Sequence, residues 1–211
     1  MFQLIWSHGW GFDTTFFKPL LQALPDYDHL LIDWGYFGDP SFRTAASYPC
    51  VGIGHSLGFA KLLELPRLWA PPSFSGLISL GGFTKFCQHA DFKVGIPRRV
   101  VQRMVDKFAT QPRQVLSDFY QSCGYDQDWA QPSFLSLQRL TADLQFLKTV
   151  STRLPKVPHL AIAGETDQIC SLAQQQTLFD RVEIVKGAHN FPATHIDETA
   201  TLIRHFLKEL A

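Results

Sequence analysis

A serine between two glycines carries the strongest chemical signal in the chain. Ser56 is the centre of Gly54-His55-Ser56-Leu57-Gly58, which matches the pattern G-x-S-x-G. In this pattern the serine occupies a tight turn between a strand and a helix, and the glycines allow neighbouring backbone to approach closely. A serine hydroxyl needs a general base to accept its proton before it is a good nucleophile at neutral pH. Ser56 is therefore a candidate nucleophile. The alternative is a glycine-rich turn with a solvated serine.

Eight histidines compete for the role of the base. We favour His189, which lies in a loop between the apolar run 182–185 and the last helical stretch, and keep His195 as the second candidate. An acid must then hold the imidazole in the correct tautomer. Asp167 follows the preceding apolar run, and Glu165 is the alternative carboxylate. Nucleophile, acid and base then occur in the chain order that accompanies a G-x-S-x-G turn. The competing interpretations are a hydrogen-bonded loop histidine and a solvated turn carboxylate.

Attack on a carbonyl also needs N–H donors, because negative charge builds up on the carbonyl oxygen. Losing one such donor costs about 3 kcal/mol of barrier. The N–H of Leu57 is one candidate donor, since it opens a helix directly after Ser56. The second candidate is the backbone of Trp10 in His8-Gly9-Trp10-Gly11. The alternative for this stretch is a glycine turn followed by a core tryptophan.

These candidates must be positioned by strands, and the hydrophobic pattern indicates where the strands lie. Short apolar runs alternate with segments of helical period, which is typical of βαβ units and a mainly parallel sheet. We expect strands at residues 2–6, 29–33, 50–54, 76–80, 159–163 and 182–185. The candidate nucleophile, acid and base each follow one of these strands. The three side chains should therefore converge at the carboxyl edge of one sheet.

Helical spacing fills the intervals between the expected strands. The first helix begins with Asp13 or Thr14 as its cap, and the helix after the candidate nucleophile ends before Pro66. Thr194 and Asp197 are expected to cap the final helix, whose apolar face would pack on the sheet.

Residues 86–154 contain helical stretches and no convincing strand. Helices are expected to start at Pro97, Pro112 and Pro132, because proline is favoured at the first helical position. An all-helical insertion between two strands is typical of a lid. The chain would then consist of a core formed by residues 1–85 and 155–211 and a helical lid formed by residues 86–154.

Composition and charge exclude several other classes of protein. The 19 Lys and Arg residues balance 19 Asp and Glu residues, which argues against a nucleic-acid partner. No apolar run approaches the roughly 20 residues of a membrane span, and the first residues lack the features of a signal peptide. The four cysteines show no metal-ligand spacing and indicate buried thiols in a reducing compartment. We expect a cytoplasmic protein without a metal or cofactor.

Four of these features together resemble a known family. They are the His8-Gly9-Trp10-Gly11 loop, the G-x-S-L-G turn at Ser56, the run 149–167 and the Ala-His-x-x-Phe/Pro loop at His189. The combination looks like the pimeloyl-[acyl-carrier protein] methyl ester esterases of biotin synthesis. Almost the whole chain resembles α/β-hydrolases with a helical lid. Two departures are His55, where that family often has Trp, and Phe59, which replaces a second glycine.

The resemblance implies a fold, a mechanism and a substrate. The fold would be α/β, with a mainly parallel sheet flanked by helices and a lid inserted at about 86–154. Ser56, Asp167 and His189 would form a triad that needs no cofactor, with Trp10 and Leu57 at the oxyanion hole. The substrate would be the methyl ester of a pimeloyl chain held on acyl-carrier protein. The chain also begins directly at the oxyanion-loop strand, without the β-hairpin that usually precedes it.

Basic residues of the lid fit a carrier-protein substrate. Arg99 and Arg103 lie at i, i+4 on one helix face, with Arg98 beside them. Acyl-carrier proteins are acidic and bear a phosphopantetheine group, and both features suit guanidinium pairing. The alternative is a solvated basic face. Phe83, which follows the fourth strand, is a further candidate for contact with substrate.

The sequence therefore favours a serine carboxylic-ester hydrolase that works through an acyl-enzyme. The narrower hypothesis is a pimeloyl-[acyl-carrier protein] methyl ester esterase. An acyl thioesterase or a general small-ester carboxylesterase would use the same groups. A non-catalytic binding protein of this fold, or a lyase or peroxidase variant, is the alternative from another class, because fold does not fix chemistry.

Overall fold

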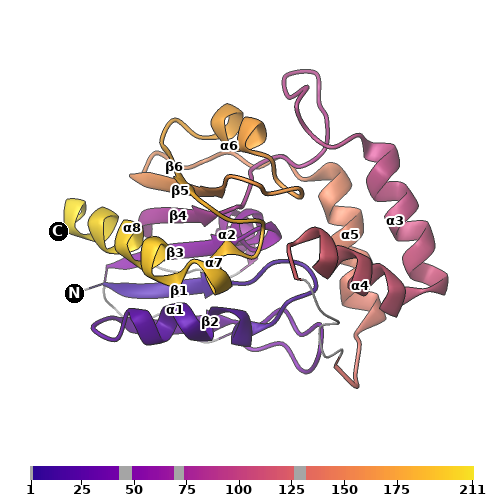
Figure 1. Ribbon diagram of the computed structural model, residues 1–211, viewed down its shortest axis with the longest axis horizontal. Helices are drawn as coiled ribbons and strands as arrows, with labels where there is room; N and C mark the ends of the chain where they lie inside the picture. Colours follow the sequence, from indigo (N-terminus) through magenta and orange to yellow (C-terminus); the bar gives the residue numbers. More distant parts are fainter. Residues whose placement is uncertain (1, 43–48, 69–73, 126–131) are drawn as a thin grey trace.

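The computed structural model describes residues 2–42, 49–68, 74–125 and 132–211. Its centre is a six-stranded, all-parallel sheet with the order β2-β1-β3-β4-β5-β6 (Figure 1). The strands are β1 (Gln3–Ser7), β2 (Asp28–Ile32), β3 (Cys50–His55), β4 (Phe74–Leu80), β5 (His159–Gly164) and β6 (Val182–Val185). All six strands expected from the sequence are present, and no end is displaced by more than two residues.

The central strands β1 and β3 are buried along their whole length because both of their faces are covered. Every residue of β1 and β3 is buried, as is usual for a parallel sheet between two layers of helices. In the register of the sheet, Ser7 at the end of β1 lies beside Ile32 and Gly54 near the ends of β2 and β3. The loops that leave the strands at this carboxyl edge therefore start side by side.

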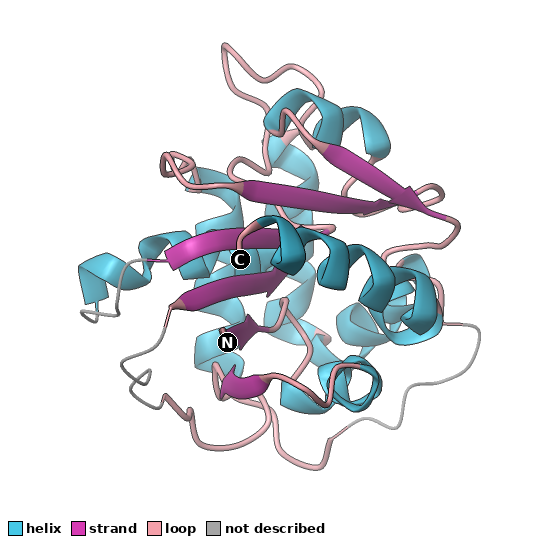
Figure 2. Ribbon diagram, turned by 90° about the vertical axis from the view of Figure 1, so that its left-hand side faces the viewer, coloured by secondary structure: helices cyan, strands magenta, loops and turns pink. Residues whose placement is uncertain are grey.

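Helices cover both faces of the twisted sheet (Figure 2). The elements flanking the sheet are the 3₁₀ turn η1 (Thr14–Phe17), α1 (Lys18–Ala23), α2 (Leu57–Leu68), α6 (Leu172–Leu178), α7 (Phe191–Thr194) and α8 (Ile196–Glu209). On one face, Leu77 of β4 packs with Phe59 of α2 and with Phe179, which directly follows α6. The adjacent residue, Gly76, lies against Phe206 of α8 on the opposite face. This alternation is the ordinary two-residue period of a strand.

Two expected helix boundaries are wrong. The helix after Ser56 does not end before Pro66 but continues to Leu68. Pro66 lies in the last turn, so its missing N–H removes only one hydrogen bond. Pro132 does not start a helix either, because α5 (Leu137–Thr149) begins five residues later. The N–H of Ser136 donates instead to the carbonyl of Tyr36, at 2.7 Å, which ties the preceding segment to the core.

The cap of the final helix also differs from expectation, whereas the first cap is confirmed. Asp13 caps η1 by accepting a hydrogen bond from the N–H of Thr15 at 2.8 Å. At the other end of the chain, α7 and α8 are separate helices and His195 is the N-cap of α8. Thr194 belongs to α7. Asp197 lies inside the first turn of α8, where its carboxylate interacts favourably with the helix dipole but is not the N-cap.

In the described residues between β4 and β5, three helices pack beyond the carboxyl edge of the sheet (Figure 1). They are α3 (Arg98–Thr110), α4 (Pro112–Ser122) and α5. The expected start at Pro112 is confirmed, and Pro97 is the N-cap of α3. No strand occurs among the described residues of 86–154, and residues 126–131 lie outside them. In the described ranges, no helix combines the length and apolar character that crossing a bilayer requires.

The helix α5 is attached to the core through a partly buried charge cluster. Asp143 of α5 accepts hydrogen bonds from Lys61 Nζ, at 2.5 Å, and from the hydroxyl of Tyr36. The ammonium of Lys61 lies 3.8 Å from the ring centroid of Trp34. Burial lowers the pKa of Lys61, and the carboxylate of Asp143 opposes that shift. Lys61 of α2, which follows the candidate nucleophile closely in the chain, thus binds a helix of the lid.

We expect Asp143→Leu to lower the free energy of unfolding by about 3 kcal/mol, because it leaves the ammonium of Lys61 buried without its carboxylate. Adding Lys61→Met should restore most of that loss. Urea denaturation of the two single variants and the double variant measures the coupling. Asp106→Ala is the control, because Asp106 is an exposed aspartate on α3 that accepts a hydrogen bond from Gln102. Equal unfolding energies for Asp143→Leu and Asp106→Ala would contradict the attachment.

Candidate active site

Ser56 occupies a sharp turn between β3 and α2. Its φ is +53°, and among the described residues it is the one non-glycine residue with a positive φ. Its N–H donates to the carbonyl of Leu80, at 3.1 Å, which ties the turn to the end of β4. A residue other than glycine held in this strained conformation is a frequent mark of a functional site. The side chain of Ser56 lines a cavity at the carboxyl edge of the sheet.

The two glycines of the motif are explained by close backbone contacts. A methyl group added at Gly54 would lie 2.3 Å from the Cα of Phe59. One added at Gly58 would lie 2.2 Å from the carbonyl oxygen of Ser7. Both distances are far inside van der Waals contact. The first turn of α2 therefore lies directly against β1 and β3, and side chains at either position would displace it.

His189 and Asp167 form a buried pair behind Ser56. His189 Nδ1 lies 2.7 Å from Asp167 Oδ2, and both side chains are fully buried. The other oxygen, Oδ1, accepts hydrogen bonds from the N–H groups of Ile169 at 2.8 Å and Cys170 at 2.9 Å. A carboxylate held in this way accepts a hydrogen bond from the Nδ1–H of His189. The other ring nitrogen, Nε2, is then unprotonated and can act as an acceptor. Nε2 has no hydrogen-bond partner among the described residues.

The alternative acid and base occupy other positions. Glu165 is exposed. His195 lies at the start of α8, where its Nδ1 is 3.0 Å from the hydroxyl of Thr194. Of the candidates from the sequence, only Asp167 and His189 are thus brought together.

The turn after β4 connects the candidate nucleophile to the buried pair. A methyl group added at Gly81 would lie 3.2 Å from Asp167 Oδ2 and 3.4 Å from His189 Nδ1. One added at Gly82 would lie 3.1 Å from the carbonyl oxygen of Ser56. Two consecutive glycines of this turn therefore contact the histidine–aspartate pair on one side and the backbone of Ser56 on the other.

The two candidate oxyanion donors both belong to residues that line the cavity. Leu57 is the first residue of α2, so its N–H has no acceptor within the helix. Trp10 lies in the loop after β1, and its indole Nε1–H donates to the carbonyl of Leu140 in α5, at 2.9 Å. The Trp10 ring makes edge contacts with Phe108 and Phe119 of the lid. The side chain of Trp10 therefore contacts the lid, which the sequence pattern did not reveal.

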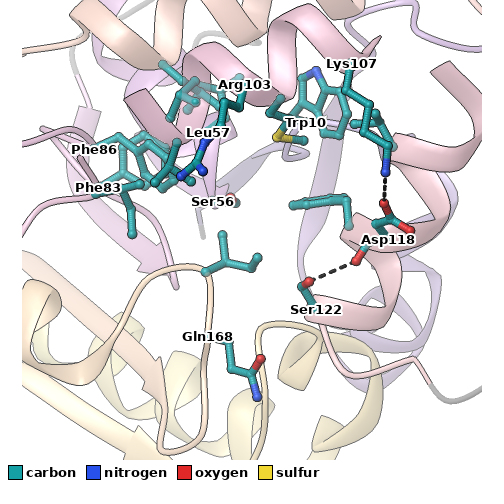
Figure 3. Close-up of a pocket in the computed structure, with 18 residues that line it drawn as sticks. Trp10, Ser56, Leu57, Phe83, Phe86, Arg103, Lys107, Asp118, Ser122 and Gln168 are labelled. Atoms are coloured by element: carbon teal, nitrogen blue, oxygen red, sulfur yellow. Dashed lines mark hydrogen bonds and ion pairs between the residues drawn. The ribbon is translucent and has the colours of Figure 1, made fainter. Parts of the chain in front are cut away.

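The cavity has a volume of about 430 Å³ and lies between the core and the lid. Most of its lining is apolar, and it includes the expected residue Phe83. Figure 3 shows Ser56 in the middle of the labelled side chains, with Arg103 reaching from α3 towards it. Lys107 and Asp118, which form an ion pair at 2.6 Å, lie at one side. The cavity is therefore suited to an apolar chain with polar groups at its margin.

The three lid arginines do not share one location. Arg103 lines the cavity and makes no ion pair with another described residue. Arg98 and Arg99 line a separate surface depression together with Lys148 of α5. In the described part of the chain, no group of three or more His, Cys, Asp or Glu residues could hold a metal ion.

Sequence reasoning missed the buried polar residues that support the site. Gln175 of α6 donates from Nε2 to the carbonyl of Gly82, at 2.7 Å. Asn190 donates from Nδ2 to the carbonyl of Gly124, at 3.0 Å, which ties the loop of His189 to the end of α4. The capping box of Ser171 and Gln174 at the start of α6 was a readable signal for that helix. Nothing in the local sequence indicates the partners of Gln175 or Asn190.

Comparison with known proteins agrees with this geometry at the level of the fold. An esterase from Exiguobacterium antarcticum superposes with a TM-score of 0.81 at 16% identity, covering 98% of this chain and 92% of that one. An enol-lactonase from Burkholderia xenovorans LB400 superposes with a TM-score of 0.73 at 15% identity, covering 98% and 91%. With a six-stranded parallel sheet, flanking helices and an inserted lid, the chain has the α/β-hydrolase fold.

The sequence comparisons point to a particular group of hydrolases. The pimeloyl-[acyl-carrier protein] methyl ester esterase of Stenotrophomonas maltophilia (strain K279a) is 25% identical over 99% of this chain and 93% of that protein. The biotin biosynthesis bifunctional protein BioHC of Cellvibrio japonicus is 29% identical over 55% of this chain, and the match spans 26% of that longer protein. No protein-family model matches the chain. The resemblance expected from the sequence is thus confirmed, and the chain is a distant relative of these esterases.

A buried histidine beside the site should make stability depend on pH. Burial lowers the pKa of His55 well below its ordinary value of 6.5, and the neighbouring His189 and His8 lower it further. Below about pH 6.5 the unfolded chain binds a proton at this position and the folded chain does not. Stability should therefore fall as the pH is lowered, by up to about 1.4 kcal/mol per pH unit from this group.

Urea denaturation between about pH 7 and pH 5 measures this dependence for the wild type and for His55→Phe. We expect the phenylalanine variant, which has no proton to gain at this position, to lose less stability on acidification. Parallel pH dependences of the two proteins would contradict the assignment.

Proposed function

We propose that the protein is a serine carboxylic-ester hydrolase. Two observations support this proposal: Ser56 is strained and lines an apolar cavity, and His189 and Asp167 form a buried hydrogen-bonded pair next to the turn after β4. The distant homology to esterases supports it independently. We assign Ser56 as nucleophile, His189 as general base and Asp167 as the group that orients the base.

Acylation follows from these assignments. The Oγ of Ser56 attacks the carbonyl carbon of the ester while His189 Nε2 takes the hydroxyl proton. Asp167 holds Nδ1–H and stabilises the imidazolium that forms. The N–H groups of Leu57 and Trp10 bind the oxyanion of the tetrahedral intermediate. The C–O bond to the alcohol then breaks, and the proton on Nε2 passes to the departing oxygen.

Deacylation repeats the same steps with water. His189 Nε2 removes a proton from a water molecule, which attacks the acyl carbon bound to Ser56. A second oxyanion forms and collapses, the bond to the Oγ of Ser56 breaks, and the serine regains its proton from Nε2. The products are the carboxylic acid and the free enzyme. No group other than those of the chain and water is needed.

We further propose that the acyl part of the substrate is a pimeloyl chain carried on acyl-carrier protein and ended by a methyl ester. The relatives named for this reaction match 99% of the chain, and the apolar cavity suits an unbranched chain. Arg103 at the cavity, with Arg98 and Arg99 on the outer side of α3, would face an acidic carrier. The four buried free cysteines fit a reducing cytoplasm.

We expect purified protein to hydrolyse a nitrophenyl butyrate ester and to react covalently with a fluorophosphonate probe, and Ser56→Ala to abolish both. His189→Ala should reduce turnover by at least about 10²-fold, because the serine loses its base. Ser171→Ala, which removes a hydroxyl at the start of α6, is a control outside the site. Labelling that persists in Ser56→Ala would identify a different nucleophile and overturn the assignment.

The substrate is tested in a bacterial strain that requires biotin because it lacks its own pimeloyl ester esterase. We expect the wild-type gene to restore growth without biotin, and Ser56→Ala to fail. With purified pimeloyl-carrier methyl ester, the expected product is methanol. Release of the carrier thiol instead would indicate a thioesterase. Failure to restore growth at matched expression would exclude the biotin role while leaving the esterase assignment intact.

A further inference from the structure

His55, the residue before the candidate nucleophile, touches the candidate base. Its Nε2 lies 3.1 Å from the main-chain carbonyl oxygen of His189. The ring centroids of the two histidines are 4.7 Å apart. Because His55 is also joined to Ser56 through a peptide bond, one fully buried residue connects the turn of the nucleophile to the loop of the base.

The chemistry of this contact fixes the protonation of His55. A carbonyl oxygen only accepts hydrogen bonds, so Nε2 must carry the proton. The pKa of the ring is lowered by its burial, which keeps the imidazole neutral. Nδ1 is then unprotonated, and it has no hydrogen-bond partner among the described residues. His55 therefore acts here as a neutral donor and takes no proton from its surroundings.

The surroundings of His55 hold its ring in one orientation. Phe16 stacks on it with centroids 4.3 Å apart, and Phe12 meets it edge-on at 5.4 Å. A ring packed in this way cannot turn its Nε2–H away from the carbonyl without displacing aromatic side chains. The hydrogen bond to the backbone of His189 is therefore set by the core of the protein.

We propose that His55 is a positioning residue that fixes the backbone of His189, and with it the imidazole, relative to Ser56. This inference rests on the proposed function. The side chain of His189 is held at Nδ1 by Asp167, and its neighbour Asn190 is held by the end of α4. His55, which directly precedes the nucleophile, donates a hydrogen bond to the main-chain carbonyl of His189 itself.

Three variants of His55 separate the effect of its hydrogen-bond donor from the effect of its packing. His55→Phe keeps an aromatic ring and removes the donor. His55→Gln and His55→Met have side chains of similar length and shape, and only glutamine retains an N–H group. We expect kcat to fall about 10- to 100-fold in the Phe and Met variants, with KM unchanged, because misplacing a catalytic group slows chemistry without weakening binding. Gln should retain most of the wild-type kcat.

A control and a second readout exclude a merely structural role. His29 lies at the amino end of β2. Its Nδ1 accepts a hydrogen bond from the indole N–H of Trp6, and its Nε2 lies 2.9 Å from the carbonyl oxygen of Leu24. His29→Phe thus removes a similar hydrogen bond at the far edge of the sheet. It should lower the melting temperature and leave kcat unchanged. The rate of fluorophosphonate labelling at Ser56 should follow kcat across the His55 variants.

The outcomes distinguish this inference from the proposed function. Activity that survives in Ser56→Ala would overturn the function itself. If Ser56→Ala is inactive but Gln and Met at position 55 have equal kcat, the positioning role is wrong and the function stands. An equal loss of kcat in His29→Phe would also overturn the inference, because the effect would then follow stability alone. If His55→Phe does not fold, the Gln and Met pair makes the comparison.

Discussion

The hydrogen bond between Asp167 and His189 is the interaction on which the chemistry of this site depends. It joins two fully buried side chains across 2.7 Å, and it selects the tautomer that leaves Nε2 free to accept a proton. A buried carboxylate needs further donors, and the N–H groups of Ile169 and Cys170 supply them. In the proposed mechanism, this arrangement is what gives Ser56 a base.

The parallel sheet brings these groups together because all of its strands end at one edge. The turn after β3 presents Ser56, the turn after β5 presents Asp167, and the loop after β6 presents His189. Glycines at the closest contacts allow this convergence, since the first turn of α2 lies directly on β1 and β3. The loop after β1 places Trp10 at the cavity, and the indole of Trp10 binds α5 through the carbonyl of Leu140.

The strands, the turn of the nucleophile and the identity of the buried pair could be predicted because they depend on local patterns. Apolar runs located all six strands, and the segments that follow β5 and β6 supplied Asp167 and His189, the favoured acid and base. The boundary at Pro66 was wrong because α2 continues through the proline to Leu68, against the usual tendency of proline to end a helix.

The supporting contacts could not be predicted, because each joins residues that are distant in sequence. His55 and His189 are 134 residues apart, Gln175 and Gly82 are 93 apart, and Lys61 and Asp143 are 82 apart. A buried histidine or lysine looks the same in the sequence as an exposed one. These side chains gain their partners only when α5 meets α2, α6 meets the turn after β4, and the loop after β6 meets the end of β3.

A crystal structure of the protein after reaction with an alkyl phosphonate tests the central claim most directly. We expect a covalent bond from phosphorus to the Oγ of Ser56, with a phosphonyl oxygen facing the N–H groups of Leu57 and Trp10. His189 Nε2 should then lie about 2.6 to 3.2 Å from an oxygen on phosphorus or from the Oγ of Ser56. An adduct on another residue, or an imidazole of His189 that points away from the bound phosphonate, would contradict it.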